Sequence, residues 1–278
     1  MSRQINEILS GLSQDENGVW YSSFENTSQQ KEIRLRKKVA AKIYDDYLDE
    51  VANHHSVEVM DYEVRRALQQ LPENGVIVDV GGCWGWHWRN LCRQRPDVQV
   101  VIMDFVKENL RHAQNVLGLT VNKSIHLVHG DATQCPFPDD SFDLYWSVQT
   151  LQHFPDFVKC VEEAKRILSG GGVFLNYSLN REKAVEILYR MLGKNYIVEG
   201  CYMESIYLSR ASATQKMQIE TVFGHPVKQR FSEILFHPDL RIKTGREGSF
   251  WGRVDSNIGS SLPILGWIAR QKSFQTIK

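Results

Sequence analysis

The sequence lacks the features of a secreted, membrane-spanning or metal-binding protein. Its five cysteines are odd in number and include no Cys-x-x-Cys pair, so neither a disulfide framework nor a zinc site is expected. The first residues, Met-Ser-Arg-Gln, do not open an apolar signal-peptide core, and no apolar run reaches the ~18 residues that a membrane span needs. We therefore expect a cytoplasmic protein without a metal ion.

An excess of one charge is also lacking. Lysine plus arginine and aspartate plus glutamate each total 33, which gives a net charge of zero. Because proteins that bind nucleic acid usually carry a basic surface, nucleic acid is not an expected partner, and neither is an anionic membrane. The local basic run at residues 31–38 is interleaved with Ile33 and Leu35, and we interpret it as the solvated face of a helix.

What is present fits a folded α/β domain. Residues 27–52 and 56–71 show the apolar spacing of helices, and Pro72-Glu-Asn-Gly75 then breaks the pattern. From Val76 onward, short apolar segments alternate with helical segments, which predicts βαβ units and a parallel sheet. The predicted strands are residues 76–80, 98–103, 124–129, 142–148 and 172–177, and the predicted helices between them are residues 86–95, 105–117 and 156–168.

The alternation loosens after residue 180. Two helices are predicted at residues 182–192 and 203–222, and two last strands at residues 240–244 and 262–269. Because the segment 181–226 is rich in aromatic residues and interrupts the alternation, we interpret it as an insertion over the carboxyl edge of the sheet, where open parallel sheets bind ligands. The alternative is a packing subdomain without ligand contact.

A glycine-rich loop follows the first predicted strand, in the segment Val78-Asp-Val-Gly-Gly-Cys-Trp-Gly85. Such a strand-to-helix turn lets the backbone approach a ligand closely. The dinucleotide fingerprint needs glycines at relative positions 0, 2 and 5, but counting from Gly81 these positions hold Gly81, Cys83 and Trp86, and counting from Gly82 also fails. No Gly-Lys-Ser/Thr occurs in the loop either, so a Walker-type phosphate loop is excluded.

The loop instead resembles motif I of class I S-adenosylmethionine-dependent methyltransferases, in which an acidic residue is followed two positions on by Gly-x-Gly-x-Gly. The acidic residue corresponds to Asp79, and the outer glycines to Gly81 and Gly85, while Cys83 stands at the middle glycine. The resemblance implies that Gly81, Gly82, Cys83 and Gly85 bring the backbone against the methionyl part of S-adenosylmethionine. It also implies that Asp79 accepts hydrogen bonds there.

The second predicted strand is followed by an acidic residue, Asp104, which lies 19 positions beyond Gly85. A carboxylate at this place can accept hydrogen bonds from both ribose hydroxyls of an adenosine, and the family has its ribose-binding acid there. The alternative is an ordinary helix N-cap. The next residue, Phe105, is expected to pack on the adenine face, although a core position is equally ordinary for it.

Four further segments resemble the same family. The Asp131-Ala132 pair follows the third predicted strand, and the resemblance implies that it holds adenine, with an Asx-turn as the alternative. The remaining segments resemble the family's runs around the fourth and fifth strands, with Gly170 replacing the usual proline; they are Cys135–Asp143, Leu151–Asp156 and Arg166–Gly172. Together the signals most resemble the broad type 11, UbiE-like branch.

The resemblance implies an α/β, Rossmann-like fold with a seven-stranded, mostly parallel sheet and helices on both faces. A final antiparallel strand is expected beside the fifth strand. Within a single domain we expect an N-terminal helical arm or lid at residues 1–71, a cofactor-binding core at 75–178, a helical substrate-side insertion at 181–226, and the end of the sheet at 227–278.

Two more cofactor contacts are expected outside these motifs. Tyr21 forms an aromatic pair with Trp20 in an otherwise polar arm, which predicts a lid over the cofactor; anchoring on the core surface is the alternative. Ser147, near the end of the predicted fourth strand, is also included among the cofactor-binding residues.

Methyl transfer is an in-line displacement that needs mainly positioning and exclusion of water. A general base helps only if the acceptor begins as a hydroxyl or ammonium group. His153 is the leading candidate for the base, because the segment after the fourth strand faces the reaction centre in this family; a structural role is the alternative. His54 and His55 are weaker candidates, and His87, among three tryptophans, is interpreted as a packing residue.

The predicted function is therefore S-adenosylmethionine-dependent methylation of an O or N atom of a small molecule, such as a metabolite, a sugar or a natural-product intermediate. A protein or peptide acceptor stays open. One alternative is a degenerate methyltransferase-like binding subunit without turnover, for which Cys83 and Gly170 are the support. A nicotinamide oxidoreductase is disfavoured by the glycine spacing.

Overall fold

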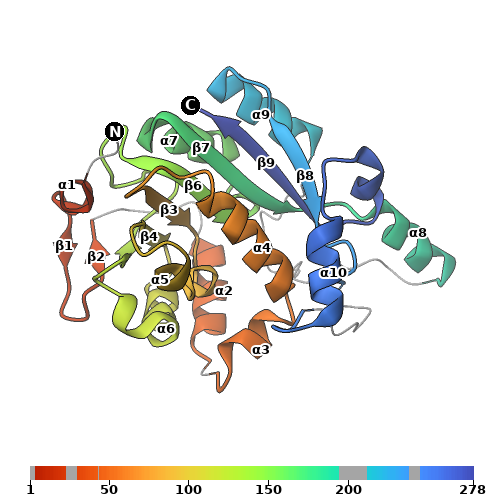
Figure 1. The fold of residues 1–278 in the computed structure, drawn as a ribbon, viewed down its shortest axis with the longest axis horizontal. Coiled ribbons are helices and arrows are strands. Elements are labelled where there is room, and N and C mark those ends of the chain that lie inside the picture. The colour runs from red at the N-terminus through yellow and green to blue at the C-terminus, as the bar shows by residue number, and fades with distance from the viewer. Residues whose placement is uncertain (1–3, 23–29, 43, 194–211, 238–244) are drawn as a thin grey trace.

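The computed structural model describes residues 4–22, 30–42, 44–193, 212–237 and 245–278. These residues form one twisted sheet with helices packed on both of its faces (Figure 1). The strand order is β1-β2-β5-β4-β3-β6-β7-β9-β8. The predicted α/β class is therefore confirmed, and the described part of the chain has nine strands in place of the seven expected.

The centre of the sheet is parallel and matches the prediction. It consists of β3 (Val76–Val80), β4 (Gln99–Asp104), β5 (Ile125–His129), β6 (Phe142–Val148) and β7 (Leu168–Leu179). Every residue of β3 is buried, as expected for a strand that is paired on both edges and covered on both faces. The strand β7 begins earlier than predicted because the glycine turn at 170–172 lies within it, beside a register irregularity in β6.

The C-terminal end of the sheet is antiparallel. The last strand, β9 (Gln271–Ile277), lies between β7 and β8 (Lys228–Ser232) and is antiparallel to both, which confirms the strand expected beside the fifth. The prediction of a strand at 262–269 is wrong, because this segment contains the short helix η5 (Pro263–Trp267). Proline favours the first turn of a helix. The other predicted strand, at 240–244, lies outside the described residues.

The N-terminal residues extend the opposite edge. After α1 (Ile5–Leu9), the short strands β1 (Ser13–Gln14) and β2 (Trp20–Tyr21) form an antiparallel pair, and β2 lies parallel to β5. The helical arm expected at residues 1–71 therefore includes a strand pair, which the sequence does not reveal because strands of two residues leave no alternation to detect.

Most of the remaining helices differ from the prediction in their ends, whereas no helix was predicted at α10 (Phe250–Ile258). The helix expected at 27–52 is divided into α2 (Gln30–Ala40) and α3 (Tyr47–Val51). Asp46 caps α3 by accepting hydrogen bonds from two backbone N–H groups, which explains the break. The other helices are α4 (Val57–Leu68), η1 (Trp86–Trp88), α5 (Leu91–Gln94), α6 (Lys107–Leu117), η2 (Gly118–Thr120), η3 (Leu151–His153), α7 (Phe157–Ile167), α8 (Lys183–Met191), α9 (Ala213–Phe223) and α10 (Phe250–Ile258).

Two apolar clusters sandwich the sheet. One contains side chains of α7 and α9 and the other contains side chains of α4 and α6. The placement of α9 corrects the prediction for the segment 181–226, since Ile219 and Phe223 of this helix are buried in the core against α7 rather than over the carboxyl edge. In α8 no residue is buried, and residues 194–211 lie outside the described part of the chain. No described helix has both the length and the apolarity to cross a bilayer.

Candidate active site

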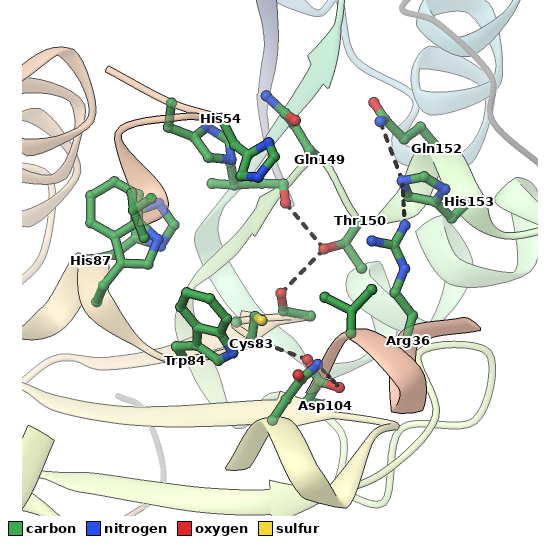
Figure 2. Close-up of a pocket in the computed structure, with 18 of the residues that line it drawn as sticks. Arg36, His54, Cys83, Trp84, His87, Asp104, Gln149, Thr150, Gln152 and His153 are labelled. Carbon is green, nitrogen blue, oxygen red and sulfur yellow. Dashed lines mark hydrogen bonds between the residues drawn. The ribbon is translucent and has the colours of Figure 1, made fainter. Parts of the chain in front are cut away.

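A cavity of about 290 Å³ lies at the carboxyl ends of β3, β4 and β6. Its walls come from the glycine loop after β3, from Asp104 and Phe105 after β4, from the segment 148–154 after β6, and from the N-terminal helices (Figure 2). This is the edge at which open parallel sheets bind ligands. The cavity thus brings together residues that lie far apart in the sequence.

The glycine loop forms the floor of the cavity and is tightly packed from below. Gly81 and Gly85 adopt positive φ angles of 72° and 67°. A Cβ atom on Gly81 would collide with the side chain of Thr150, and one on Gly82 would come within 2.6 Å of Asp79 Oδ2. Gly81, Gly82 and Cys83 line the cavity, whereas Gly85 does not, and packs against Ile102 and Leu117. The loop can therefore present bare backbone to a ligand.

Cys83 occupies the place of the middle glycine with a left-handed φ of 51°. Its backbone N–H donates a hydrogen bond of 3.1 Å to Asp104 Oδ2. This bond links the glycine loop to the end of the neighbouring strand β4. The loop is therefore held in place although Cys83 departs from the family pattern.

Asp104 lies at the cavity wall with a buried carboxylate. Its Oδ1 accepts hydrogen bonds from Val106 N at 2.8 Å and from Asn109 Nδ2 at 3.3 Å. Burial raises the pKa of Asp104 to about 6, against the lowering effect of these bonds. The helix N-cap of α6 is Val106, so the N-cap alternative does not describe Asp104. Phe105 lies beside it in the cavity wall.

Two predicted cofactor contacts lie beneath the cavity rather than in it. The carboxylate of Asp79 accepts a 2.7 Å hydrogen bond from Trp88 Nε1, and burial raises its pKa to about 7. The hydroxyl of Ser147 donates to Val80 O at 3.0 Å and is fully buried. Neither side chain lines the cavity. Asp79 is thus placed to support the loop, and Ser147 joins β6 to β3.

A second hollow adjoins the cavity beyond Phe105 and Asp104. It is lined by Gly130 and Ala132 as well as by these two residues, which is where the resemblance predicted the adenine. The carboxylate of Asp131 lines neither hollow; it accepts hydrogen bonds of 2.9 Å from the backbone N and the hydroxyl of Thr133. For Asp131 the structure therefore shows the Asx-turn alternative.

The N-terminal arm covers the cavity, but with other residues than predicted. Tyr21 pairs with His129 in the sheet, is 43% exposed and does not line the cavity, so the structure places it in an anchoring position. The covering residues come from α2 and the segment that follows it, including Arg36 and Tyr44. The ring of Tyr44 lies 4.7 Å from that of Trp84 in the glycine loop.

His153 lies in the cavity wall as predicted. Its Nε2 is 3.3 Å from Nη2 of Arg36. Burial, together with the charge of Arg36, lowers the pKa of His153 to about 3. The imidazole is consequently neutral at physiological pH, but such a low pKa makes it a weak base.

Three further imidazoles, those of His54, His55 and His87, line the cavity. Figure 2 shows His87 across the cavity from Arg36 and His153. His87 does pack as predicted, since its ring stacks on that of Trp86 at 4.1 Å, but it also contributes to the cavity wall, which sequence reasoning missed. Its position two residues after Gly85, at the start of a helix leading out of the glycine loop, was the available signal.

Comparison with known proteins agrees with this arrangement. Residues 78–176 match the family described as "Methyltransferase domain". The chain is 31% identical to a chloroplastic 2-methyl-6-phytyl-1,4-hydroquinone methyltransferase of Oryza sativa subsp. japonica over 35% of this chain and 28% of that protein. It is 28% identical to the ubiquinone/menaquinone biosynthesis C-methyltransferase UbiE of Rickettsia massiliae over 47% of this chain and 56% of that protein. The chain thus spans between about a quarter and somewhat over half of these relatives.

The fold also has solved counterparts. An S-adenosylmethionine-dependent methyltransferase from Thermotoga maritima superimposes with a TM-score of 0.57 at 15% identity, covering 90% of this chain and 99% of that one. At this identity the likeness concerns the fold, whereas the sequence match covers the glycine loop, Asp104 and His153. Residues 78–176 therefore form a class I, S-adenosylmethionine-dependent methyltransferase domain that is similar to those of UbiE and of the hydroquinone methyltransferase.

Proposed function

We propose that the protein transfers a methyl group from S-adenosylmethionine to an O or N atom of a small molecule in the cytoplasm. The observation that carries the proposal is the cavity in which the glycine loop, Asp104 and Phe105 come together. Metabolites, sugars and natural-product intermediates are the proposed acceptor classes, and the neutral net charge supports them over nucleic acid.

The residues of the cavity fit this cofactor. Gly81 and Gly82, at which a Cβ atom would collide with Thr150 and Asp79, line the cavity with bare backbone, and the buried carboxylate of Asp104 can accept hydrogen bonds from ribose hydroxyls. Phe105 lines both the main cavity and the small adjoining hollow of about 10 Å³, and from the cavity wall it offers apolar surface to adenine. The guanidinium of Arg36 gives the cavity a cation that suits the carboxylate of the methionyl part.

When bound, S-adenosylmethionine supplies a methyl group that is already activated by the sulfonium sulfur. The protein then has to align the acceptor with that methyl group and keep water out. The covering residues of the N-terminal arm, Arg36, Tyr44 and Val51, suit the second task because they close one side of the cavity.

A carbon acceptor is the second candidate. It is favoured by the Rickettsia relative, which is named a C-methyltransferase. Degenerate binding without turnover is the third, and it predicts cofactor binding without a product. A screen of oxygen, nitrogen and carbon acceptors for methylated product separates these three possibilities.

The first experiment is calorimetric titration with S-adenosylmethionine and S-adenosylhomocysteine, with NADH as the control ligand. The wild-type protein is expected to bind both adenosyl ligands and not NADH. The Asp104→Asn variant should bind them more weakly by about 1.5–3 kcal/mol, since hydrogen bonds to charged groups are worth roughly that. Wild-type affinity should also fall as the pH drops through about 6, where the carboxyl of Asp104 gains a proton.

The matched control is Asp97→Asn, because Asp97 forms a surface ion pair with Arg95 at 2.7 Å and does not line the cavity. This variant should bind like the wild type. A folded wild-type protein that binds neither adenosyl ligand would contradict the proposed function. Unchanged affinity in Asp104→Asn would contradict the ribose assignment alone.

A further inference from the structure

The helices that cover the cavity are attached to the body of the protein from behind. Helix α2 contributes Arg36 and Val39 to the cavity wall, and α3 contributes Glu50 and Val51. Both helices contact a single side chain of α6, that of His112. This side chain is buried and does not line the cavity, so it can influence a ligand only through the helices that it holds.

Each ring nitrogen of His112 has a partner on one of the two helices. Its Nε2 lies 2.6 Å from the carbonyl oxygen of Ala40, the last residue of α2. Its Nδ1 lies 2.7 Å from the hydroxyl of Tyr47, the first residue of α3. Because a carbonyl oxygen can only accept a hydrogen bond, Nε2 donates to Ala40, and in the neutral ring Nδ1 accepts from the hydroxyl of Tyr47. One imidazole thus holds the end of α2 and the start of α3.

Four rings pack around this junction, those of Tyr44, Tyr47, Trp84 and His112. The ring of Tyr47 lies edge-on to that of Trp84 at 5.2 Å and lies 5.6 Å from that of His112. Such tilted and edge-on contacts between aromatic rings are favourable. Trp84 belongs to the glycine loop and lines the cavity (Figure 2). The junction of α2 and α3 is therefore packed against the glycine loop as well as bonded to α6.

Helix α6 connects this junction to Asp104. The side chain of Asn109 lines the cavity and donates a hydrogen bond of 3.3 Å to Asp104 Oδ1. His112 lies one turn further along the same face, because residues three apart in a helix are neighbours on its surface. One face of α6 thus orients the carboxylate proposed to bind ribose and holds the two helices that cover it.

Two other ion pairs of α2 and α3 lie nearer the surface. Lys37 of α2 pairs with Glu108 at 3.9 Å, and Asp49 of α3 pairs with Arg246 at 3.2 Å. The four side chains are between 35% and 60% exposed, and ion pairs between exposed side chains contribute little. The buried hydrogen bonds of His112 are therefore better placed to hold the two helices.

Building on the proposed binding of S-adenosylmethionine, we propose that His112 is a positioning residue that keeps α2 and α3 over the bound cofactor. It acts through Arg36 and Tyr44, which close one side of the cavity. A ligand leaves faster when the helices that cover it are held less firmly. The hydrogen bonds of His112 therefore slow the dissociation of the cofactor and of its product, and loosening them does not slow ligand entry.

The test measures association and dissociation of S-adenosylhomocysteine with the full chain by rapid mixing and tryptophan fluorescence. His112→Phe keeps a ring but removes both hydrogen bonds, and should speed dissociation about tenfold or more, since one hydrogen bond is worth a factor of about 2–10. Tyr47→Phe removes one bond and should have a smaller effect, which should vanish when His112 is already phenylalanine. His112→Gln, whose amide N–H can still donate to Ala40, should fall between wild type and His112→Phe.

Two matched variants serve as controls. His126→Phe makes the same exchange at an imidazole of β5 that is equally buried, at 8% exposure, bonds Gln99 at 3.1 Å and does not line the cavity. Lys37→Gln removes an exposed ion pair of α2. Both variants should release S-adenosylhomocysteine at the wild-type rate.

The outcomes separate this role of His112 from a general effect on stability. Wild-type dissociation rates in His112→Phe and Tyr47→Phe would overturn the inference, and so would equal acceleration by His126→Phe. If His112→Phe does not fold, Tyr47→Phe and His112→Gln decide in the same way. A folded wild-type protein that does not bind S-adenosylhomocysteine would contradict the proposed function, and the inference with it.

Discussion

Cys83 shows how one residue can depart from a motif while the local backbone is retained. The left-handed conformation at this position, with φ of 51°, is one that glycine adopts without a steric penalty and that other residues adopt at some cost. The penalty is offset in part by the hydrogen bond from Cys83 N to Asp104. Burial also raises the pKa of the Cys83 thiol, so the side chain stays neutral beside that carboxylate.

Two substitutions of Cys83 should separate the effect of side-chain size on stability from the effect of the left-handed backbone conformation. Cys83→Gly relieves the left-handed strain but costs chain entropy, so the free energy of unfolding should change by less than ~1 kcal/mol and cofactor binding should persist. Cys83→Val places a β-branched residue at positive φ and should destabilise by about 1–3 kcal/mol. Urea denaturation and calorimetric titration measure the two effects. A valine variant as stable as the glycine variant would show that the loop is not held in this conformation in solution.

At the scale of elements, the helix α2 lines the cavity with one turn, which contains Arg36 and Val39. Arg36 reaches His153 across the cavity wall, whereas Arg34, two positions earlier on the same helix, is exposed. The cation on this helix contributes to the low pKa of His153 after burial, which is the larger cause. The electrostatic state of a residue that follows β6 therefore depends on an N-terminal helix more than a hundred residues away in sequence.

The variant Arg36→Gln tests this dependence. Removing the cation should raise the pKa of His153 from about 3, but burial should still hold it below the ordinary histidine value of ~6.5. The pKa is followed by NMR of the imidazole during a pH titration. Arg34→Gln should leave it unchanged, and an equal shift in both variants would show that general charge, not the contact with Arg36, sets the pKa.

At the scale of the whole molecule, a buried ion pair between two residues of the C-terminal part is hydrogen-bonded to the start of α4. The carboxylate of Glu233 is fully buried and accepts hydrogen bonds from Arg270, just before β9, and from the backbone N of Ser56 at the start of α4. The charge of Arg270 and the hydrogen bonds lower the pKa of Glu233 although burial opposes them. His55 and Arg270 both line the cavity, so this ion pair also shapes the site.

Breaking this ion pair should destabilise the fold strongly. Glu233→Gln leaves the charge of Arg270 buried without its partner, and such changes cost about 3–5 kcal/mol. Because the folded pKa of Glu233 is depressed, its contribution is present above the unfolded pKa and is lost as the pH falls through the folded one. Urea denaturation from pH 7 to pH 3 should show a shallower acid loss in the variant.

The control for that series is Glu247→Gln. Glu247 pairs with Arg89 at the surface and its side chain is 54% exposed, so this change should cost no more than ~1 kcal/mol. Similar losses in the two variants would mean that burial of Glu233 does not carry the stabilisation.

Much of the fold could be predicted because the central strands are apolar and continuous. The runs that form β3 to β6 are buried on both faces, and such strands can be recognised without knowledge of their partners. The strand β9, with Gln271, Lys272, Ser273 and Gln275, carries no such signal, and only its pairing with β7 and β8 makes it a strand. The segment 262–269 is apolar and therefore resembles a strand in sequence, but in the structure it contains the short helix η5.

The sequence alone determined the family, the cofactor edge of the sheet, and the positions of the glycine loop, Asp104, Phe105 and His153, because these depend on local spacing along consecutive residues. Only the tertiary structure decided the direction in which each polar side chain points. It turned Asp79 and Asp131 away from the cavity and placed His87 in its wall. Which face of a turn or short helix becomes the wall of a cavity depends on what packs behind it, and those neighbours come from distant parts of the chain.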